Sequence, residues 1–211
     1  MVRRLIDVAG AVIGLVLLSP VLLAVALVVR LSLGRPVLFR QVRAGRHGRP
    51  FTIYKFRSMR NPDGPVELGV DDAWRLTPVG RFLRGASLDE LPELINVLKG
   101  DMGLVGPRPL LPEYVERYSP EQARRLAVRP GVTGYAQVKG RNALPWEDRF
   151  ALDVYYVDHQ SLWLDLRILV LTVVQVLKRD GISAEGHATS PVFLGTSVAE
   201  PSSVKRIQLG G

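Results

Sequence analysis

The chain has 211 residues and a mass of 23.3 kDa, is 47% hydrophobic and 23% charged, and contains no cysteine. This composition excludes a largely disordered or collagen-like chain, a disulfide scaffold, a zinc–thiolate site and a cysteine nucleophile. The net charge of +8 is local, because residues 30–60 contain nine lysines and arginines and no acid. A basic block of this kind indicates a nucleic acid or an anionic membrane surface as its partner.

The first predicted element is an apolar run of 22 residues, 8–29, without a charged side chain. Its length is that of a transmembrane helix, and the preceding Arg3 and Arg4 also resemble the start of a signal peptide. Two features favour a third geometry, a re-entrant helix that enters and leaves the membrane by the same face. Positive charge flanks both ends of the run, as it does on cytoplasmic segments. Ser19-Pro20 interrupts its middle.

A break at Ser19 and Pro20 leaves two arms of 12 and 9 residues. At about 1.5 Å per residue they are roughly 18 and 13 Å long, so each reaches only about halfway through a hydrocarbon core of roughly 30 Å. Proline also frees the carbonyl of Val16, and we expect the Ser19 hydroxyl to bind it. The sequence therefore predicts a monotopic anchor over residues 1–35, in the cytoplasmic membrane, with the remaining chain facing the cytoplasm.

Two strand-like runs, 37–43 and 51–57, flank a glycine-bounded turn at 45–48 and predict a β-hairpin. Residues 61–74 carry acids, proline and glycine without periodicity and predict a loop. The sequence Gly-Pro-Arg-Pro at 106–109 predicts a rigid turn.

Helices are predicted further along the chain. Apolar residues at 91, 94, 95 and 98 have helical spacing before Lys99-Gly100, and 120–128 is a second helix candidate. The apolar run 162–177 is either a core helix or an interfacial helix lying beside the anchor. We expect a domain over 36–185 and an extended C-terminal tail over 186–211.

The acid pair Asp89-Glu90 is the first candidate for chemistry. Ser87-x-x-Glu90 matches a capping box, so both acids can be explained as helix-start residues alone. The same position favours an ionised Asp89 and a phosphate bound nearby. Adjacent helical side chains point in different directions, so one carboxylate can attack or hold a metal while the other moves a proton.

Three basic residues are candidates for phosphate binding. Arg108 stands between two prolines, and a guanidinium held in this way can bind a phosphate bidentately; a structural turn is the alternative. Lys55 lies where basic and aromatic residues alternate, which also fits an exposed strand face. Arg84 precedes the acid pair by about one helical turn and can equally be a surface charge.

The sequence resembles the small monotopic phosphoglycosyl transferases, the bacterial sugar transferase family that acts on polyprenol phosphate. The resemblance covers about residues 1–180 and rests on several motifs in one order. These are Ser19-Pro20, YKFRSM (54–59), SLDELPELINVLKGDM (87–102), LVGPRPL (104–110), RPGVTGYAQVKGRN (129–142) and LDVYYVD (152–158).

The resemblance implies transfer of a sugar-1-phosphate from a UDP-sugar to undecaprenyl phosphate with release of UMP, the first membrane step of glycan biosynthesis. It implies that Asp89 is the nucleophile, forming an aspartyl-phosphosugar with Mg²⁺ at its carboxylate, and that Glu90 assists proton transfer. It places Lys55, Arg84, Arg108 and Asp153 in or around the site. Membrane phospholipids are expected partners and nucleic acid is not, while a homo-oligomer is left open.

The expected fold is a helix-rich α+β structure. It comprises a re-entrant membrane helix–break–helix, a small β-hairpin and amphipathic interfacial helices around a cytosolic active site. Two other function classes explain part of the sequence. Nucleic-acid binding accounts for the basic block but not for the apolar run, and a non-catalytic membrane-anchored adaptor that binds anionic lipid does not require the acid pair and the basic residues to converge.

Overall fold

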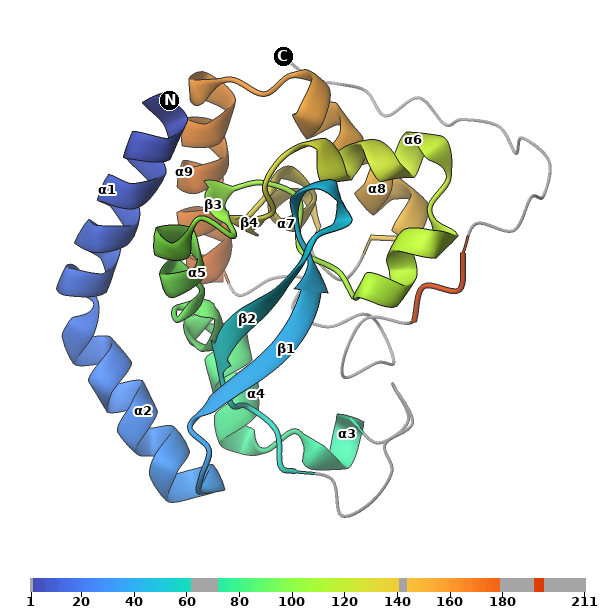
Figure 1. Ribbon diagram of the computed structural model, residues 1–211. Coiled ribbons are helices and arrows are strands. Elements are labelled where there is room, and N and C mark those ends of the chain that lie inside the picture. The colour runs from blue at the N-terminus through green and yellow to red at the C-terminus, as the bar shows by residue number, and fades with distance from the viewer. Residues whose placement is uncertain (1, 62–71, 141–143, 179–191, 196–211) are drawn as a thin grey trace.

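The computed structural model describes residues 2–61, 72–140, 144–178 and 192–195. The structure is a helix-rich α+β fold with a small antiparallel sheet, as predicted, and a second pair of short parallel strands (Figure 1). Most of the predicted loop 61–74 and of the predicted tail 186–211 lies outside the described residues.

The N-terminal apolar run forms two helices, α1 (Val2–Leu17) and α2 (Ser19–Leu33), bent by 63° at the predicted break. The Ser19 hydroxyl donates to the carbonyl of Val16 at 2.8 Å, which confirms the predicted partner. Backbone bonds from Leu18 to Gly14 and from Leu22 to Leu18 continue across the bend. No single helix of the described residues is long and apolar enough to cross a membrane, whereas this bent pair is when taken together.

The predicted hairpin is confirmed. Strands β1 (Leu38–Ala44) and β2 (Pro50–Phe56) pair antiparallel, with Phe39 opposite Lys55, around the 3-10 turn η1 (Arg46–Gly48). The backbone N–H of Ala44 donates to the carbonyl of Leu110 at 2.9 Å, which joins the end of β1 to the segment after the Gly-Pro-Arg-Pro turn.

The helix predicted around residue 91 begins differently. A 3-10 turn, η2 (Leu88–Glu90), precedes the short helix α5 (Glu93–Lys99), which ends at Gly100 in the left-handed region. The predicted apolar face is wrong in part, because Ile95 and Leu98 are exposed. Their places inside are taken by Glu93 and Asn96, which have polar partners on β2.

The remaining elements connect and cover this centre. The helix predicted at 120–128 is split into α6 (Pro120–Ala123) and the 3-10 segment η4 (Arg124–Ala127). The others are α3 (Asp72–Arg75), α4 (Pro78–Gly85), β3 (Gly103–Val105), η3 (Pro112–Arg117), β4 (Gly131–Thr133), α7 (Tyr135–Lys139), α8 (Trp146–Asp158) and α9 (Leu162–Lys178). Strands β3 and β4 pair in parallel, a contact too short to predict from sequence periodicity.

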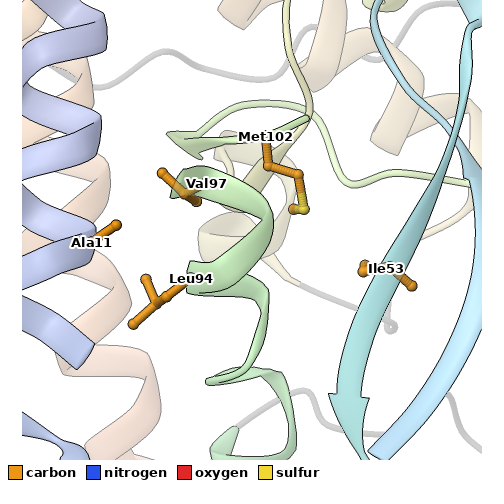
Figure 2. Packing of buried hydrophobic residues seen from close by; sticks show 5 residues of the cluster. All are labelled: Ala11, Ile53, Leu94, Val97 and Met102. Atoms are coloured by element: carbon orange, nitrogen blue, oxygen red, sulfur yellow. The ribbon is translucent and has the colours of Figure 1, made fainter. Parts of the chain in front are cut away.

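The central core joins α1 to the hairpin across α5. Its buried members come from α1 (Ala11), β2 (Ile53), α5 (Leu94 and Val97) and the following loop (Met102), as Figure 2 shows. Helix α1 is therefore packed against the rest of the fold through the face that carries Ala11.

Helix α9 fits both interpretations of its sequence. Ile168 is fully buried against α7, α8 and β3, as a core helix requires. Its other face carries exposed Trp163, Leu166, Val170 and Val173, as an interfacial helix requires.

Asn96 should stabilise the packing of α5 against β2. It is fully buried, accepts from the backbone N–H of Tyr54 at 3.1 Å and donates to the carbonyl of Thr52 at 2.7 Å and to Asp101 at 3.3 Å. Asn96→Ala leaves buried backbone groups unpaired, so we expect a loss of about 2–4 kcal/mol in the free energy of unfolding. Denaturant unfolding in detergent measures it.

The matched control is Ile95→Ala on the exposed side of the same helix, which should change stability by at most about 0.5 kcal/mol. Equal unfolding midpoints for the two variants would contradict the assignment of Asn96 as the link between α5 and β2.

Candidate active site

The acid pair lies on η2, at the centre of the molecule. The preceding Ser87 has φ 56° and makes no capping hydrogen bond through its side chain, so the capping-box interpretation is wrong. Asp89 is 8% exposed. A carboxylate that is buried without serving as a helix cap needs another reason to be there, and its neighbours supply one.

Glu90 contacts two of the three predicted basic residues, Lys55 and Arg108. Its Oε1 atom lies 2.6 Å from Nζ of Lys55 and 2.6 Å from Nη2 of Arg108. Nζ of Lys55 is also 3.0 Å from Oε1 of Glu93. Lys55 comes from β2, Glu90 from η2 and Arg108 from the turn after β3, so three separate segments meet at the Glu90 carboxylate, and α5 joins them through the contact of Glu93 with Lys55.

Close backbone packing fixes the turn that carries Arg108. The N–H of Gly106 donates to the carbonyl of Thr133, and the N–H of Gly131 donates to the carbonyl of Pro107. A Cβ on Gly131 would lie 2.0 Å from the backbone nitrogen of Gly106, so only glycine permits this approach. The turn is a structural element, as the alternative interpretation held, and it also aims Arg108 at Glu90.

Asp153 lies behind the site. It forms a buried ion pair with Arg125, with Nη2 of Arg125 at 2.7 Å and Nε at 3.0 Å from Oδ2. Nη2 of Arg125 also donates to the carbonyl of Arg108 at 2.6 Å. Asp153 therefore reaches the site through Arg125 and the backbone of Arg108, which is the geometry of a positioning residue.

Arg84 lies on the opposite side of the acid pair, on α4. Its Nε donates to Oγ of Ser58 at 2.9 Å, and Nη2 lies 2.9 Å from Sδ of Met59. Burial raises the pKa of Asp89 and the charge of Arg84 opposes that rise, so the guanidinium lies within electrostatic range of that carboxylate. The structure thus brings Lys55, Arg84 and Arg108 around the dyad.

The two carboxyl groups of the dyad have opposite pKa shifts. Burial, followed by the charge of Glu90, raises the pKa of Asp89 above its usual range. Burial alone would also raise the pKa of Glu90, but the charges and hydrogen bonds of Arg108 and Lys55 outweigh it and hold that pKa well below its usual range. Two adjacent acids in different electrostatic environments can take different chemical roles.

Glu93 and Arg125 are site residues that the sequence analysis missed. Glu93 reads as an ordinary first-turn acid, yet it is 2% exposed and its pKa is raised to about 7 by burial and by Glu90, against the charge of Lys55. Arg125 reads as one of two adjacent surface arginines. Only contacts between distant segments distinguish them.

The site offers one carboxylate to a metal ion. Glu90 is paired with two cations and Glu93 with Lys55, which leaves Asp89 as the available oxygen ligand. No cluster of three His, Cys, Asp or Glu side chains suited to a metal is found among the residues that the structure describes. Mg²⁺ in phosphate-handling sites is held by one or two carboxylates together with substrate phosphates, so this donor set fits Mg²⁺.

The chain belongs to the bacterial sugar transferase family, which matches residues 1–179. It is therefore a transferase. It is 51% identical over 194 residues to the uncharacterized sugar transferase EpsL of Bacillus subtilis, covering 92% of this chain and 96% of EpsL.

Longer relatives carry more specific names. The chain is 44% identical to the UDP-glucose:undecaprenyl-phosphate glucose-1-phosphate transferase of Caulobacter vibrioides, over 84% of this chain and 70% of that protein. It is 41% identical to the undecaprenyl-phosphate galactose phosphotransferase of Salmonella typhimurium, over 85% of this chain and 41% of that protein.

The raised pKa of Glu93 predicts a pH-dependent stability. Its folded value of about 7 lies above its ordinary 4.5, so ionising it as the pH rises from 5 to 8 destabilises the folded chain. Glu93→Gln removes this penalty. We expect the variant to gain up to about 3 kcal/mol relative to the natural chain between pH 5 and pH 8, measured by thermal unfolding in detergent.

The matched control is Glu116→Gln, which removes an exposed acid on η3 that does not contact Glu93. Its pH profile should keep the slope of the natural chain over the same range. Parallel pH profiles for the natural chain and Glu93→Gln would contradict the assignment.

Proposed function

We propose that this protein transfers a sugar-1-phosphate from a UDP-sugar to undecaprenyl phosphate and releases UMP. The observation that carries the proposal is the acid pair, with Asp89 buried and Glu90 partly buried, surrounded by Lys55, Arg84 and Arg108, because a diphosphate donor and a phosphate acceptor require cations beside a nucleophile. The names of the relatives from Caulobacter vibrioides and Salmonella typhimurium support the same acceptor. A non-catalytic adaptor would have no use for buried acids at this position.

In the first step, a carboxylate oxygen of Asp89 attacks the phosphorus that carries the sugar. The bond from this phosphorus to the bridging oxygen breaks, and UMP leaves with the bonding electron pair. The product is an acyl phosphate between Asp89 and the phosphosugar. In the second step, an oxygen of undecaprenyl phosphate attacks the same phosphorus, and the Asp89 carboxylate is released.

Glu90 is suited to accept a proton from the acceptor phosphate once the donor is bound. In the structure its Oε1 atom is occupied by Lys55 and Arg108, which makes it a weak base. Donor phosphates compete for the same two cations. When those cations turn to the donor, the pKa of Glu90 rises toward its usual range and its carboxylate becomes available.

Mg²⁺ at Asp89 would neutralise charge on the donor phosphates when bound. The cationic side chains hold and orient those phosphates in addition, and Arg108 is held for this by the two prolines and by Arg125. Asp153 acts through Arg125 and holds the backbone of Arg108 in place.

The lipid acceptor requires the reaction to take place at a membrane surface. We infer that α1 and α2 form a re-entrant anchor in the bacterial cytoplasmic membrane, with the domain on the cytoplasmic side. The bend at Leu18, the bond from Ser19 to Val16, and basic residues at both ends support this geometry.

The covalent step predicts ping-pong turnover. Enzyme given UDP-sugar and Mg²⁺ but no polyprenol phosphate should release UMP in a near-stoichiometric burst and gain the mass of one phosphosugar on the peptide containing Asp89. Asp89→Asn should lose both the burst and the adduct, because the amide lacks the attacking charge. Intact mass spectrometry and a UMP assay over a panel of UDP-sugars measure the outcome and identify the donor.

Glu90→Gln is the control for the two-step scheme, since it should impair transfer to the lipid more than adduct formation. If UMP appears only when the acceptor is present and kinetic lines intersect, the lipid phosphate attacks directly and the covalent mechanism is wrong.

The re-entrant geometry predicts that both ends of the α1–α2 pair lie in the same compartment. The chain has no native cysteine, so single cysteines at Val2 and Arg35 can be labelled selectively in intact cells and in lysed cells. Both should react only after lysis. Periplasmic labelling of position 2 alone would show a spanning helix, and Pro20→Leu should increase that labelling because an unbroken helix satisfies its backbone across the membrane.

A further inference from the structure

A cavity separate from the acid pair has a lining that combines charged and apolar side chains. It has a volume of about 430 Å³ and is bounded by the start of α1, by β3, by η4 and by the start of α9. Figure 1 shows the first turns of α1 beside α9, with β3 next to them. None of the side chains Asp89, Glu90, Lys55, Arg84 and Arg108 lines it. Its size is within the roughly 300–1,000 Å³ of small-ligand sites.

The charged lining of this cavity is basic. Four arginines, at positions 3, 4, 46 and 129, face two acids, Asp7 and Asp165. Both acids already have partners: Asp7 accepts from the backbone N–H of Leu104 at 2.9 Å, and Asp165 accepts from the hydroxyl of Tyr156 at 2.7 Å and lies 3.1 Å from Arg3. The cavity therefore has an excess of positive charge.

Several guanidinium groups that line the cavity have N–H donors that make no hydrogen bond within the described residues. Both Nη atoms of Arg3 are buried without a hydrogen bond; Nη2 forms the ion pair with Asp165, which leaves Nη1 without a partner among the described residues. Arg46 uses Nε for the carbonyl of Ala127 and Arg129 uses Nε for the carbonyl of Gly100. Within the described parts of the chain, no hydrogen bond is made by the terminal Nη groups of these two arginines. The buried Nη1 of Arg3 and the Nη groups of the exposed Arg46 and Arg129 together favour an oxyanion with several acceptor oxygens.

The other walls are apolar and continue onto an exposed surface. Ile6, Leu104, Leu166 and Leu169 line the cavity, and Leu166 also belongs to the exposed apolar face of α9. On that face Trp163 is 75% exposed, and tryptophan favours the membrane–water interface. A ligand that fits both parts has an anionic head and a hydrocarbon tail.

We propose that this cavity binds the phosphodiester headgroup of an anionic membrane phospholipid, with its acyl chains lying along α9. The inference rests on the membrane placement of α1 in the proposed function. This phospholipid is a different ligand from the lipid acceptor, because it binds at the N-terminal start of α1 whereas the acceptor must reach Asp89. Arg3 and Arg4 thereby bind lipid through a defined site and not only through diffuse surface charge.

The test uses the full-length protein in detergent micelles doped with equal amounts of phosphatidylglycerol and phosphatidylcholine, followed by native mass spectrometry. The natural chain should retain one phosphatidylglycerol with about tenfold preference over phosphatidylcholine, and Arg46→Gln/Arg129→Gln should reduce that preference to about twofold or less. Arg81→Gln/Arg124→Gln, which removes the same charge from exposed arginines outside the cavity, should keep it. Arg46→Lys, paired with natural Arg129, should retain most of the preference, which guards against misfolding of the double variant.

Three results would overturn the site. Equal retention by the natural chain and the Arg46→Gln/Arg129→Gln variant would show diffuse binding. One-for-one displacement of phosphatidylglycerol by undecaprenyl phosphate would assign the cavity to the acceptor, and displacement by millimolar inorganic phosphate alone would make it a free-phosphate site. UMP release in the presence of undecaprenyl phosphate, over the panel of UDP-sugars, is measured on the same samples: its absence in the natural chain with lipid retained refutes the proposed function and leaves this site standing.

Discussion

The oxygen Oε1 of Glu90 is bound by two cations from distant parts of the chain, Lys55 on β2 and Arg108 on the turn after β3. A buried carboxylate is expensive to desolvate unless it is paired and hydrogen-bonded, so its burial requires both cations to be present. The hairpin, η2 and the Gly-Pro-Arg-Pro turn are thereby held to one point. Further contacts serve to keep these partners in position, from Asn96 against β2 to Arg125 against the backbone of Arg108.

The side chains around the acid pair carry more positive than negative charge. Lys55, Arg84 and Arg108 surround three acids, one of which, Glu93, has a pKa near neutrality. Arg43 adds another cation, and burial together with the charge of Arg108 lowers its pKa to about 10. An excess of positive charge in a partly buried site is suited to binding phosphates.

Helix α1 is connected to the acid pair through its contacts with α5. Nη1 and Nη2 of Arg4 bind the carbonyls of Val97 and Leu98 at the end of that helix, where a cation also complements the helix dipole. Ala11 of α1 packs into the core beside Leu94, as Figure 2 shows. Because α5 directly follows the acid pair, the proposed membrane placement of α1 would set the height of the acid pair above the bilayer. The proposed phospholipid site at the N-terminal start of α1 would act on the same height, because it would hold that end of the helix at the membrane surface.

The sequence by itself determined the broken apolar helix, the hairpin, the rigid turn and the identity of the acid pair, because each depends on residues close together along the chain. Proline chemistry at Ser19-Pro20, strand alternation and glycine positions are local rules that tertiary packing did not override. Only the tertiary structure decided that Ser87 does not cap, that Glu93 faces inward while Ile95 faces outward, that Phe193 of the predicted tail packs into the core, and that Asp153 supports Arg108 through Arg125. Each of these depends on which charged or apolar side chains a distant segment places beside the residue. Helical periodicity cannot distinguish a buried acid from an exposed one, because the cation that permits burial comes from another part of the chain.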